Sequence, residues 1–294
     1  AVCGDVGPVM RDPYMTKVDE LIRMLIAAGP GGAQKATEML PAENIAPMLP
    51  EHVPLRSLVD TCSYHDLVLG VSAAGVVRGD LGDLVHIAIG GSSGWGKSVF
   101  LRMLAYQLAL SIEHIDLVLL DLENTTLSPF AKCDRLLYPI IDSERDTVSV
   151  FDDLLDELNR RRELFRQHPG VDSLQQYNAL ADEKISPLVL LGDEITALLA
   201  DKKVEAKLRT LALRARKYGM WLVLAGQDWR AVSLDPAIRN QLSCCVQFKA
   251  KSGPQSRVLL ECSDARDLTV KGRALAWLPG REMIEMQSPI IGHQ

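Results

Sequence analysis

The sequence contains no apolar run long enough to cross a membrane. Its longest runs, such as LVHIAIGG and MWLVLAG, fall far short of the ~20 residues that a spanning helix needs. The first twenty residues, AVCGDVGPVMRDPYMTKVDE, also lack the basic start and apolar core of a secretory signal peptide. We therefore expect a cytoplasmic protein with no membrane contact from this segment, and any membrane anchor would lie outside this chain.

The sequence also lacks cysteines at CxxC spacing and a surplus of positive charge. The six cysteines include no CxxC pair and the histidines are scattered, which argues against a zinc site and favours a reduced compartment. The formal net charge of the 294 residues is −6, which argues against a protein coated in basic surface. A local basic strip inside a ring or a cleft is still compatible with this charge.

Residues 1–65 differ in pattern from the rest of the chain. The stretch MTKVDELIRMLIAAGPGG places apolar residues at helical spacing and ends in a stop signal, and AQKATEML is a second short helical run. Four prolines follow within PAENIAPMLPEHVP, which is typical of a linker. We therefore predict a helical adaptor or linker over residues 1–65 and a larger domain over residues 66–294.

In the larger domain, short apolar runs alternate with amphipathic stretches. Uniformly apolar strands that alternate with helices predict a mostly parallel sheet covered by helices on both faces, which is an α/β fold. The strand candidates are residues 84–90, 115–121, 187–193, 220–226 and 244–250. The helix candidates are residues 97–111, 147–167, 204–218 and 253–261.

A phosphate-binding loop is the strongest motif in the sequence. Its eight residues match G-x-x-x-x-G-K-[ST] and stand between a predicted strand and a predicted helix, as this motif requires: Gly91, Ser92, Ser93, Gly94, Trp95, Gly96, Lys97 and Ser98. Glycines let the backbone N–H groups wrap a phosphate, and the helix N-terminus adds partial positive charge. We expect Lys97 to reach the β- and γ-phosphates of ATP and Ser98 to bind Mg²⁺.

An acidic pair, Asp193 and Glu194, stands at the end of the predicted strand 187–193. Ligands of parallel sheets bind at the carboxyl ends of the strands, so we expect Asp193 to hold Mg²⁺ and Glu194 to deprotonate the attacking water. The alternative is an ordinary acidic pair at a helix N-terminus. The wide spacing from the phosphate loop leaves room for the strand 115–121 in between, which suits the RecA-like branch of phosphate-loop ATPases.

These segments together resemble the FtsK/SpoIIIE family of double-stranded DNA translocases, within the FtsK–HerA superfamily, over roughly residues 51 to 290. VHIAIGGSSGWGKS looks like the family's phosphate-loop strand and turn, and LVLLGDEITALL like its hydrolytic strand. ELNRRRELFRQHPGVDSLQQYNAL is similar to the family's arginine-rich helix, and LALRARKYGMWLVLAGQDW to a later strand. The chain departs from the family where GQDW replaces the usual TQRP and where Trp95 replaces a small residue.

The resemblance implies roles for residues beyond the phosphate loop. Gln227 matches the family's sensor of the γ-phosphate, and Arg160 or Arg161 would be an arginine finger supplied to a neighbouring subunit. Arg216 is a competing finger, and a salt-bridged surface is the alternative for any one of these arginines. DNA would be contacted by loops that face a central pore. Ordinary surface charge is the alternative for each of the four cations that we predict to make this contact: Arg230, Arg239, Lys249 and Lys251.

The function that follows is an ATP-hydrolysing, Mg²⁺-dependent motor that translocates double-stranded DNA as a ring of six. The load would be chromosomal, plasmid or viral DNA. The alternative is an EccC-like ATPase of a protein secretion system. Such proteins string several ATPase modules together, whereas this sequence has a single phosphate loop.

Overall fold

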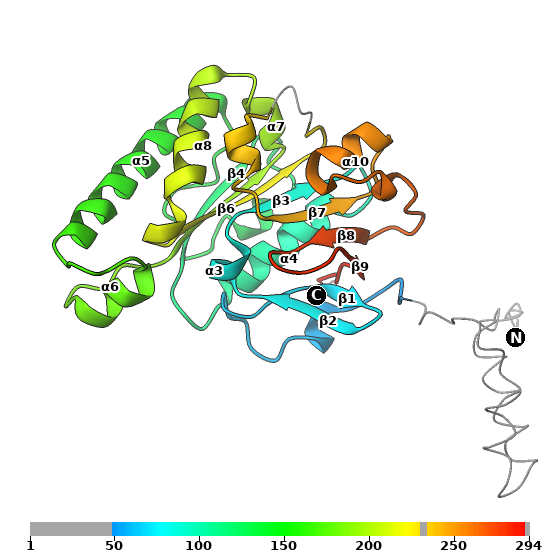
Figure 1. Cartoon of the computed structure of the whole chain (residues 1–294), viewed down its shortest axis with the longest axis horizontal. Coiled ribbons are helices and arrows are strands. Elements are labelled where there is room, and N and C mark those ends of the chain that lie inside the picture. The colour runs from blue at the N-terminus through cyan, green and yellow to red at the C-terminus, as the bar shows by residue number, and fades with distance from the viewer. Residues whose placement is uncertain (1–48, 230–233, 292–294) are drawn as a thin grey trace, which may run out of the picture. The chain divides into compact units, whose positions relative to one another are not determined.

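The computed structural model describes residues 49–229 and 234–291 (Figure 1). Within these residues, nine strands form one sheet in the order β2-β1-β9-β8-β7-β3-β6-β5-β4. The five predicted strands form its parallel half, with β3 between β6 and β7. They are β3 (Ile87–Gly90), β4 (Asp116–Asp121), β5 (Leu188–Asp193), β6 (Met220–Gly226) and β7 (Cys244–Phe248). The predicted α/β fold with a mostly parallel sheet is confirmed.

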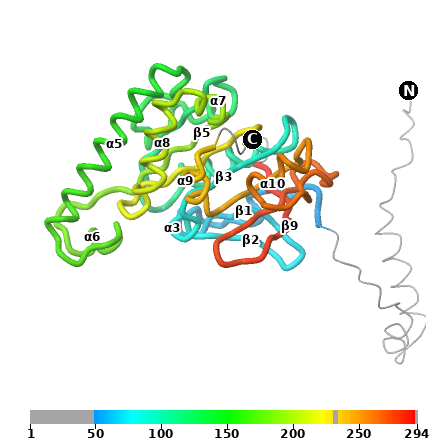
Figure 2. The backbone as a smooth tube through the Cα atoms, turned by 45° about the horizontal axis from the view of Figure 1, so that its top comes forward, coloured from blue at the N-terminus to red at the C-terminus, as the bar shows by residue number. Residues whose placement is uncertain are grey.

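The other half of the sheet is antiparallel and was not predicted as strands. It extends from β7 through β8 and β9 to the hairpin of β1 and β2. Its strands are β1 (Leu67–Ser72), β2 (Gly75–Gly79), β8 (Arg273–Trp277) and β9 (Ile284–Gln287). The first and last segments of the described chain therefore lie side by side at this end of the sheet (Figure 2).

Helices cover both faces of the sheet. The long ones agree with the predicted stretches, and polar residues cap several of them, as Ser143 caps α5 by accepting from the Asp146 N–H. They are α3 (Leu81–Leu84), α4 (Lys97–Ala109), α5 (Glu144–Arg166), α6 (Leu174–Leu180), α7 (Ile195–Leu198), α8 (Lys202–Arg214), α9 (Pro236–Arg239) and α10 (Gly253–Leu260). Short 3₁₀ turns are η2 (Leu55–Ser57), η3 (Ser128–Phe130), η4 (Arg216–Tyr218) and η5 (Asp264–Arg266). Among the described residues, none of the helices is both long and apolar enough to span a bilayer.

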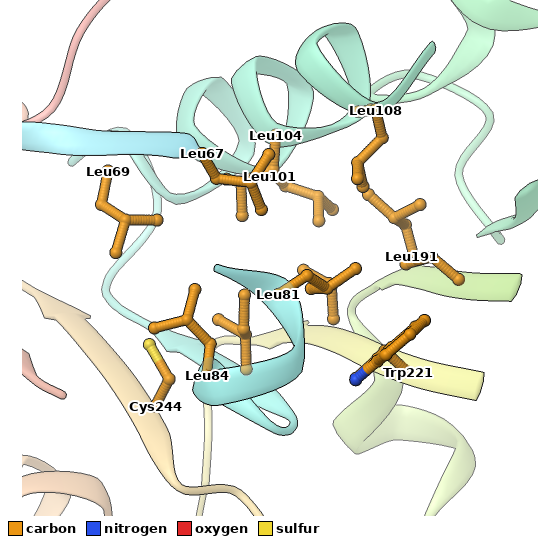
Figure 3. Close-up of a cluster of buried hydrophobic side chains, with 14 of the residues drawn as sticks. Leu67, Leu69, Leu81, Leu84, Leu101, Leu104, Leu108, Leu191, Trp221 and Cys244 are labelled. Carbon is orange, nitrogen blue, oxygen red and sulfur yellow. The ribbon is translucent and has the colours of Figure 1, made fainter. Parts of the chain in front are cut away.

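Two hydrophobic cores lie on opposite faces because side chains alternate along a strand. On β3, Ile87 and Ile89 enter the core beneath α4, whereas Ala88 enters the core beneath α5, α8 and α10. Figure 3 shows the first core, where Leu101 and Leu104 of α4 point toward the sheet and toward Leu81 of α3. This packing fixes the start of α4, and with it the phosphate loop, at the carboxyl end of β3.

Residues 49–65, which we assigned to the linker, make contacts with the sheet domain. Leu55 is buried in the α4 core, and its N–H donates to the Ile290 carbonyl at 2.9 Å. The side chains of Arg273 and Gln287 donate to the carbonyls of Leu49 and Glu51. The helices predicted before residue 49 lie outside the described residues, and the division of the chain into adaptor and motor stays a prediction.

Candidate active site

The carboxyl ends of the parallel strands bring together residues that are far apart in the sequence. The pairing aligns Gly90 of β3 with Gly226 of β6, and Asp121 of β4 with Asp193 of β5. At this edge lies a cleft of about 590 Å³, a volume usual for small-molecule sites. Most of the predicted site residues line it: Ser92, Ser93, Gly94, Gly96, Lys97, Ser98, Asp193, Glu194 and Gln227.

The phosphate loop has the backbone that anion binding requires. Gly96 has a φ of +116° and precedes α4 without a side-chain cap, so the N–H groups of the first helical turn stay available for an anion. A Cβ at Gly96 would meet Phe248 Cε1 at 3.1 Å and Gly272 Cα at 3.2 Å, so no larger residue fits there without displacement.

Ser92 gives a further sign that this loop is built for a ligand. Its Oγ is buried yet has no hydrogen-bond partner within the described structure, and the residue lines the cleft. Buried hydroxyls are rarely left unpaired, and a phosphate oxygen would supply the missing acceptor. The loop therefore fits a nucleotide phosphate.

Lys97 connects the phosphate loop to the acidic pair. Its Nζ donates to Asp193 Oδ1 at 2.8 Å and to Glu194 Oε2 at 3.0 Å, and Lys97 and Asp193 are buried. Burial alone would raise the pKa of Asp193, but the charge of Lys97 and the hydrogen bonds outweigh it and lower that pKa. Asp193 is therefore ionised at neutral pH and available to a cation.

Glu194 is held by three donors in a strained backbone conformation. Its φ of +49° lies in the left-handed region, which costs on the order of 1 kcal/mol for a residue other than glycine. Its Oε1 accepts from the Gln227 N–H at 3.1 Å and from Thr196 Oγ1 at 3.2 Å, while Oε2 accepts from Lys97. The conformation orients the carboxylate into the cleft, as a general base requires.

Sequence reasoning missed two residues of this site, Asp121 and Thr126. Asp121 ends β4, is 1% exposed, and its Oδ2 accepts from the N–H groups of Thr126 and Leu127. Thr126 Oγ1 in turn donates to Asp193 Oδ2 at 2.6 Å. The signal was an aspartate at the carboxyl end of an apolar strand, the same rule that identified Asp193.

The oxygens around Asp193 Oδ2 form a donor set that suits Mg²⁺. Ser98 Oγ lies 3.4 Å and Thr126 Oγ1 2.6 Å from this oxygen. Hydroxyl and carboxylate oxygens are the ligands that Mg²⁺ prefers. In the described part of the chain, this site included, no group of three histidine, cysteine or acidic residues could hold a metal ion, so the donor set here consists of one carboxylate and two hydroxyls.

Gly91 and Trp95, two predicted loop residues, do not line the cleft. The Trp95 carbonyl accepts from the Gly272 N–H at 3.1 Å, and Lys249 Nζ lies 5.2 Å from the centre of its ring. Lys249 also donates to the Leu268 carbonyl at 2.7 Å. The ammonium that we predicted to contact DNA is thus engaged beside the phosphate loop.

The remaining candidates for DNA contact are placed differently from one another. Arg230 lies outside the described residues. Arg239 of α9 pairs with Glu261 at 3.4 Å, and Lys251 is exposed in the turn before α10. Their contact with DNA stays a prediction.

The structure corrects one of the two predicted arginine fingers. The Arg161 side chain is 2% exposed and donates to Glu157 and to the carbonyls of Tyr218 and Gly219, so it cannot reach another subunit. The Arg160 side chain is 51% exposed and held by Glu157 at 2.7 Å. Arg160 therefore stays a prediction, with the exposed Arg216 as its competitor.

The fold and the cleft together are those of a P-loop ATPase fold. Residues 71–194 match the model of the FtsK/SpoIIIE family, the family that the sequence resemblance indicated.

Named relatives agree with that assignment. The DNA translocase FtsK of Caldanaerobacter subterraneus subsp. tengcongensis is 28% identical over 248 residues, which are 80% of this chain and 34% of the relative. The DNA translocase SftA of Bacillus subtilis is 28% identical over 76% of this chain and 25% of its own length. The chain thus spans a quarter to about a third of the length of these curated relatives.

Solved structures share the fold. The conjugation coupling protein TcpA of pCW3, in a monomer form with ATPγS, superposes with a TM-score of 0.73 at 23% identity, over 83% of this chain and 71% of that chain. ATPases 2 and 3 of EssC from Geobacillus thermodenitrificans give a TM-score of 0.75 at 18% identity, over 84% of this chain and 49% of that chain.

Proposed function

We propose that this chain is an ATP-hydrolysing motor that moves double-stranded DNA in the cytoplasm as a ring of six copies. The observation that carries the hydrolytic part is the contact of Lys97 with both Asp193 and Glu194 across the cleft. The DNA load rests on the resemblance to relatives that are named DNA translocases.

The residues of the cleft divide the chemistry of hydrolysis among them. When ATP enters, Lys97 exchanges its carboxylate partners for the β- and γ-phosphate oxygens, and the α4 N-terminus supplies further N–H donors. This exchange frees Glu194 Oε2 from Lys97, so that it can accept the proton of the attacking water. The Gln227 N–H and the Thr196 hydroxyl hold the other oxygen, Oε1. Asp193 and Ser98 would hold Mg²⁺, which supplies charge neutralisation at the phosphates.

The test is the rate of ATP hydrolysis with and without long linear double-stranded DNA. We expect DNA to raise the rate severalfold, and Glu194→Gln to lower it by about a hundredfold or more, because a general base contributes roughly 10²–10⁴. A DNA-independent rate that still depends on Glu194 would refute the DNA load and favour the EccC-like alternative.

A matched control separates loss of chemistry from loss of binding. Glu194→Gln keeps the shape of the side chain, so a fluorescent ATP analogue should bind this variant about as tightly as the wild type. Lys97→Ala should instead lose nucleotide binding, since it removes the cation that faces the phosphates.

A further inference from the structure

A groove between α5 and α8 is lined by cations that have no carboxylate partner. The two helices pack side by side at one end of the domain in both views (Figures 1 and 2). The groove holds about 570 Å³ and is lined by nine residues, none of them acidic: Leu155, Leu158, Asn159, Arg162, Thr210, Leu213, Arg214, Lys217 and Tyr218.

Cations elsewhere on these helices mostly have partners. On α5, Arg160 and Arg161 pair with Glu157, and Arg166 pairs with Glu163. On α8, three further cations are paired: Lys202 with Glu205, Lys207 with Asp152 and Arg209 with Asp235.

The cations of the groove differ from these. Within the described residues, Arg162, Arg214 and Lys217 make no ion pair and are exposed. In a chain of net charge −6, a concavity with three unpaired cations and no carboxylate is a local reversal of sign.

The floor of the groove is apolar, which indicates what kind of anion would fill it. Leu158 is buried, Leu155 and Tyr218 are half-buried, and Leu213 is 42% exposed. A nucleic-acid backbone presents charged phosphates and small sugars and has no large apolar side chains to bury against these leucines, whereas a polypeptide segment has. Unpaired cations around an apolar floor match an amphipathic helix whose polar face is acidic.

We propose that the α5–α8 groove docks an acidic, amphipathic helical segment of a partner protein. Leucine-like side chains of that segment would cover Leu155 and Leu213, and its carboxylates would pair with Arg162, Arg214 and Lys217. These ion pairs are exposed to solvent, so binding should weaken as the salt concentration rises above physiological. The groove is lined by other residues than the nucleotide cleft, so this interaction stands or falls independently of the ATPase.

The probe is a fluorescein-labelled helical peptide with leucines along one stripe and glutamates elsewhere, added to the full chain and followed by anisotropy. We expect saturable binding that the double variant Arg162→Glu/Lys217→Glu weakens by roughly tenfold or more, because each reversal removes an attraction and adds a repulsion. Leu213→Ala should weaken binding severalfold without a change of charge.

The control variant is Arg145→Glu/Lys203→Glu. It makes the same change of charge at one cation of α5 and one of α8 that lie outside the groove, and acidic residues there, in the first helical turns, are compatible with folding. An equal loss of binding in this control would overturn the proposal, because it would reveal a response to net charge alone.

Two further outcomes contradict the proposal. If the peptide fails to bind the wild-type chain at low salt, the groove is not a docking site for such a helix. If double-stranded DNA or vesicles of anionic phospholipid respond to Arg162→Glu/Lys217→Glu and the peptide does not, the groove binds a polyanion instead.

Discussion

Thr126 is placed to orient the carboxylate on which the proposed metal site depends. Its hydroxyl donates to Asp193 Oδ2 at 2.6 Å, and its own position is fixed by Asp121, which accepts the Thr126 N–H at 2.8 Å. Because the hydroxyl donates its proton to Asp193, its lone pairs face away from that oxygen. Thr126 thus acts through Asp193 as a positioning residue.

We expect Thr126→Val to lower the rate of ATP hydrolysis roughly tenfold, since a hydrogen bond to a charged group contributes on the order of 1.5–3 kcal/mol. Valine keeps the shape of threonine, so the fold should be unchanged. A Mg²⁺ titration of the rate should show half-saturation at a higher Mg²⁺ concentration.

Thr126→Ser is the control for this prediction because it restores the hydroxyl. It should recover most of the rate and of the Mg²⁺ response. If the serine variant is as slow as the valine variant, Thr126 acts through packing alone.

At the level of elements, His86 joins the start of β3 to β6 and α8 as a neutral side chain. The Leu222 N–H donates to its Nδ1 at 3.1 Å, so the proton is on Nε2, which donates to the Ala212 carbonyl at 3.1 Å. Burial lowers the pKa of His86 to about 4, and only hydrogen bonding to the backbone opposes this shift.

Acid should therefore destabilise the domain before its carboxylates titrate. Below the ordinary pKa of 6.5, the unfolded chain binds a proton at His86 and the folded chain does not, so stability falls as the pH falls toward 4. Between about pH 7.5 and about pH 5 we expect a loss of about 2 kcal/mol in the free energy of unfolding.

Urea denaturation at the two pH values measures this loss. His86→Gln should be less stable at neutral pH but should lose the extra acid sensitivity. His114→Gln is the matched control for the substitution itself, because it replaces a histidine whose side chain is 62% exposed. If the free energy of unfolding of His86→Gln falls between the two pH values as much as that of the wild type, His86 is not the source of the acid sensitivity.

The parallel elements could be predicted from the sequence and the antiparallel ones could not. Strands such as β5 and β6 are buried on both faces and therefore appear as unbroken apolar runs. β2 and β9 mix exposed and buried residues and are four or five residues long, so neither run length nor alternation marks them. Their pairing joins the two ends of the domain, which local patterns cannot reveal.

The assignment of Arg161 illustrates the same limit within a helix. Leu154, Leu158, Arg161 and Phe165 stand at spacings of four, three and four, so Arg161 falls on the apolar stripe of α5 and is buried with it. The helical spacing alone would have separated it from Arg160. The family pattern of paired arginines gave both residues the same role.

For the whole molecule, the proposed ring makes each site depend on two copies of the chain. An arginine finger stabilises the charge of phosphoryl transfer from a neighbouring subunit, and the exposed Arg160 is the residue we assign to this role. Lys97→Ala then disables the site of its own subunit, whereas Arg160→Ala disables the site of the next. Each variant alone should hydrolyse ATP slowly. For Arg160→Ala we expect a rate about a thousandfold below that of the wild type, which is the usual contribution of an arginine finger.

Mixing the two variants should restore activity, because their defects lie on different subunits. In an equal mixture, about a quarter of the interfaces in a head-to-tail ring place an intact site beside an intact finger. The ATPase rate of the mixture should therefore rise far above that of either variant, and it should fall on dilution as the ring dissociates.

Repeating the experiment with Arg216→Ala tests the competing finger. If Arg160→Ala keeps the wild-type rate, the finger is another residue. If both Arg160→Ala and the mixture are inactive, Arg160 acts within its own subunit. There it donates to Glu157, which also holds Arg161, and Arg161 donates to the Gly219 carbonyl just before β6.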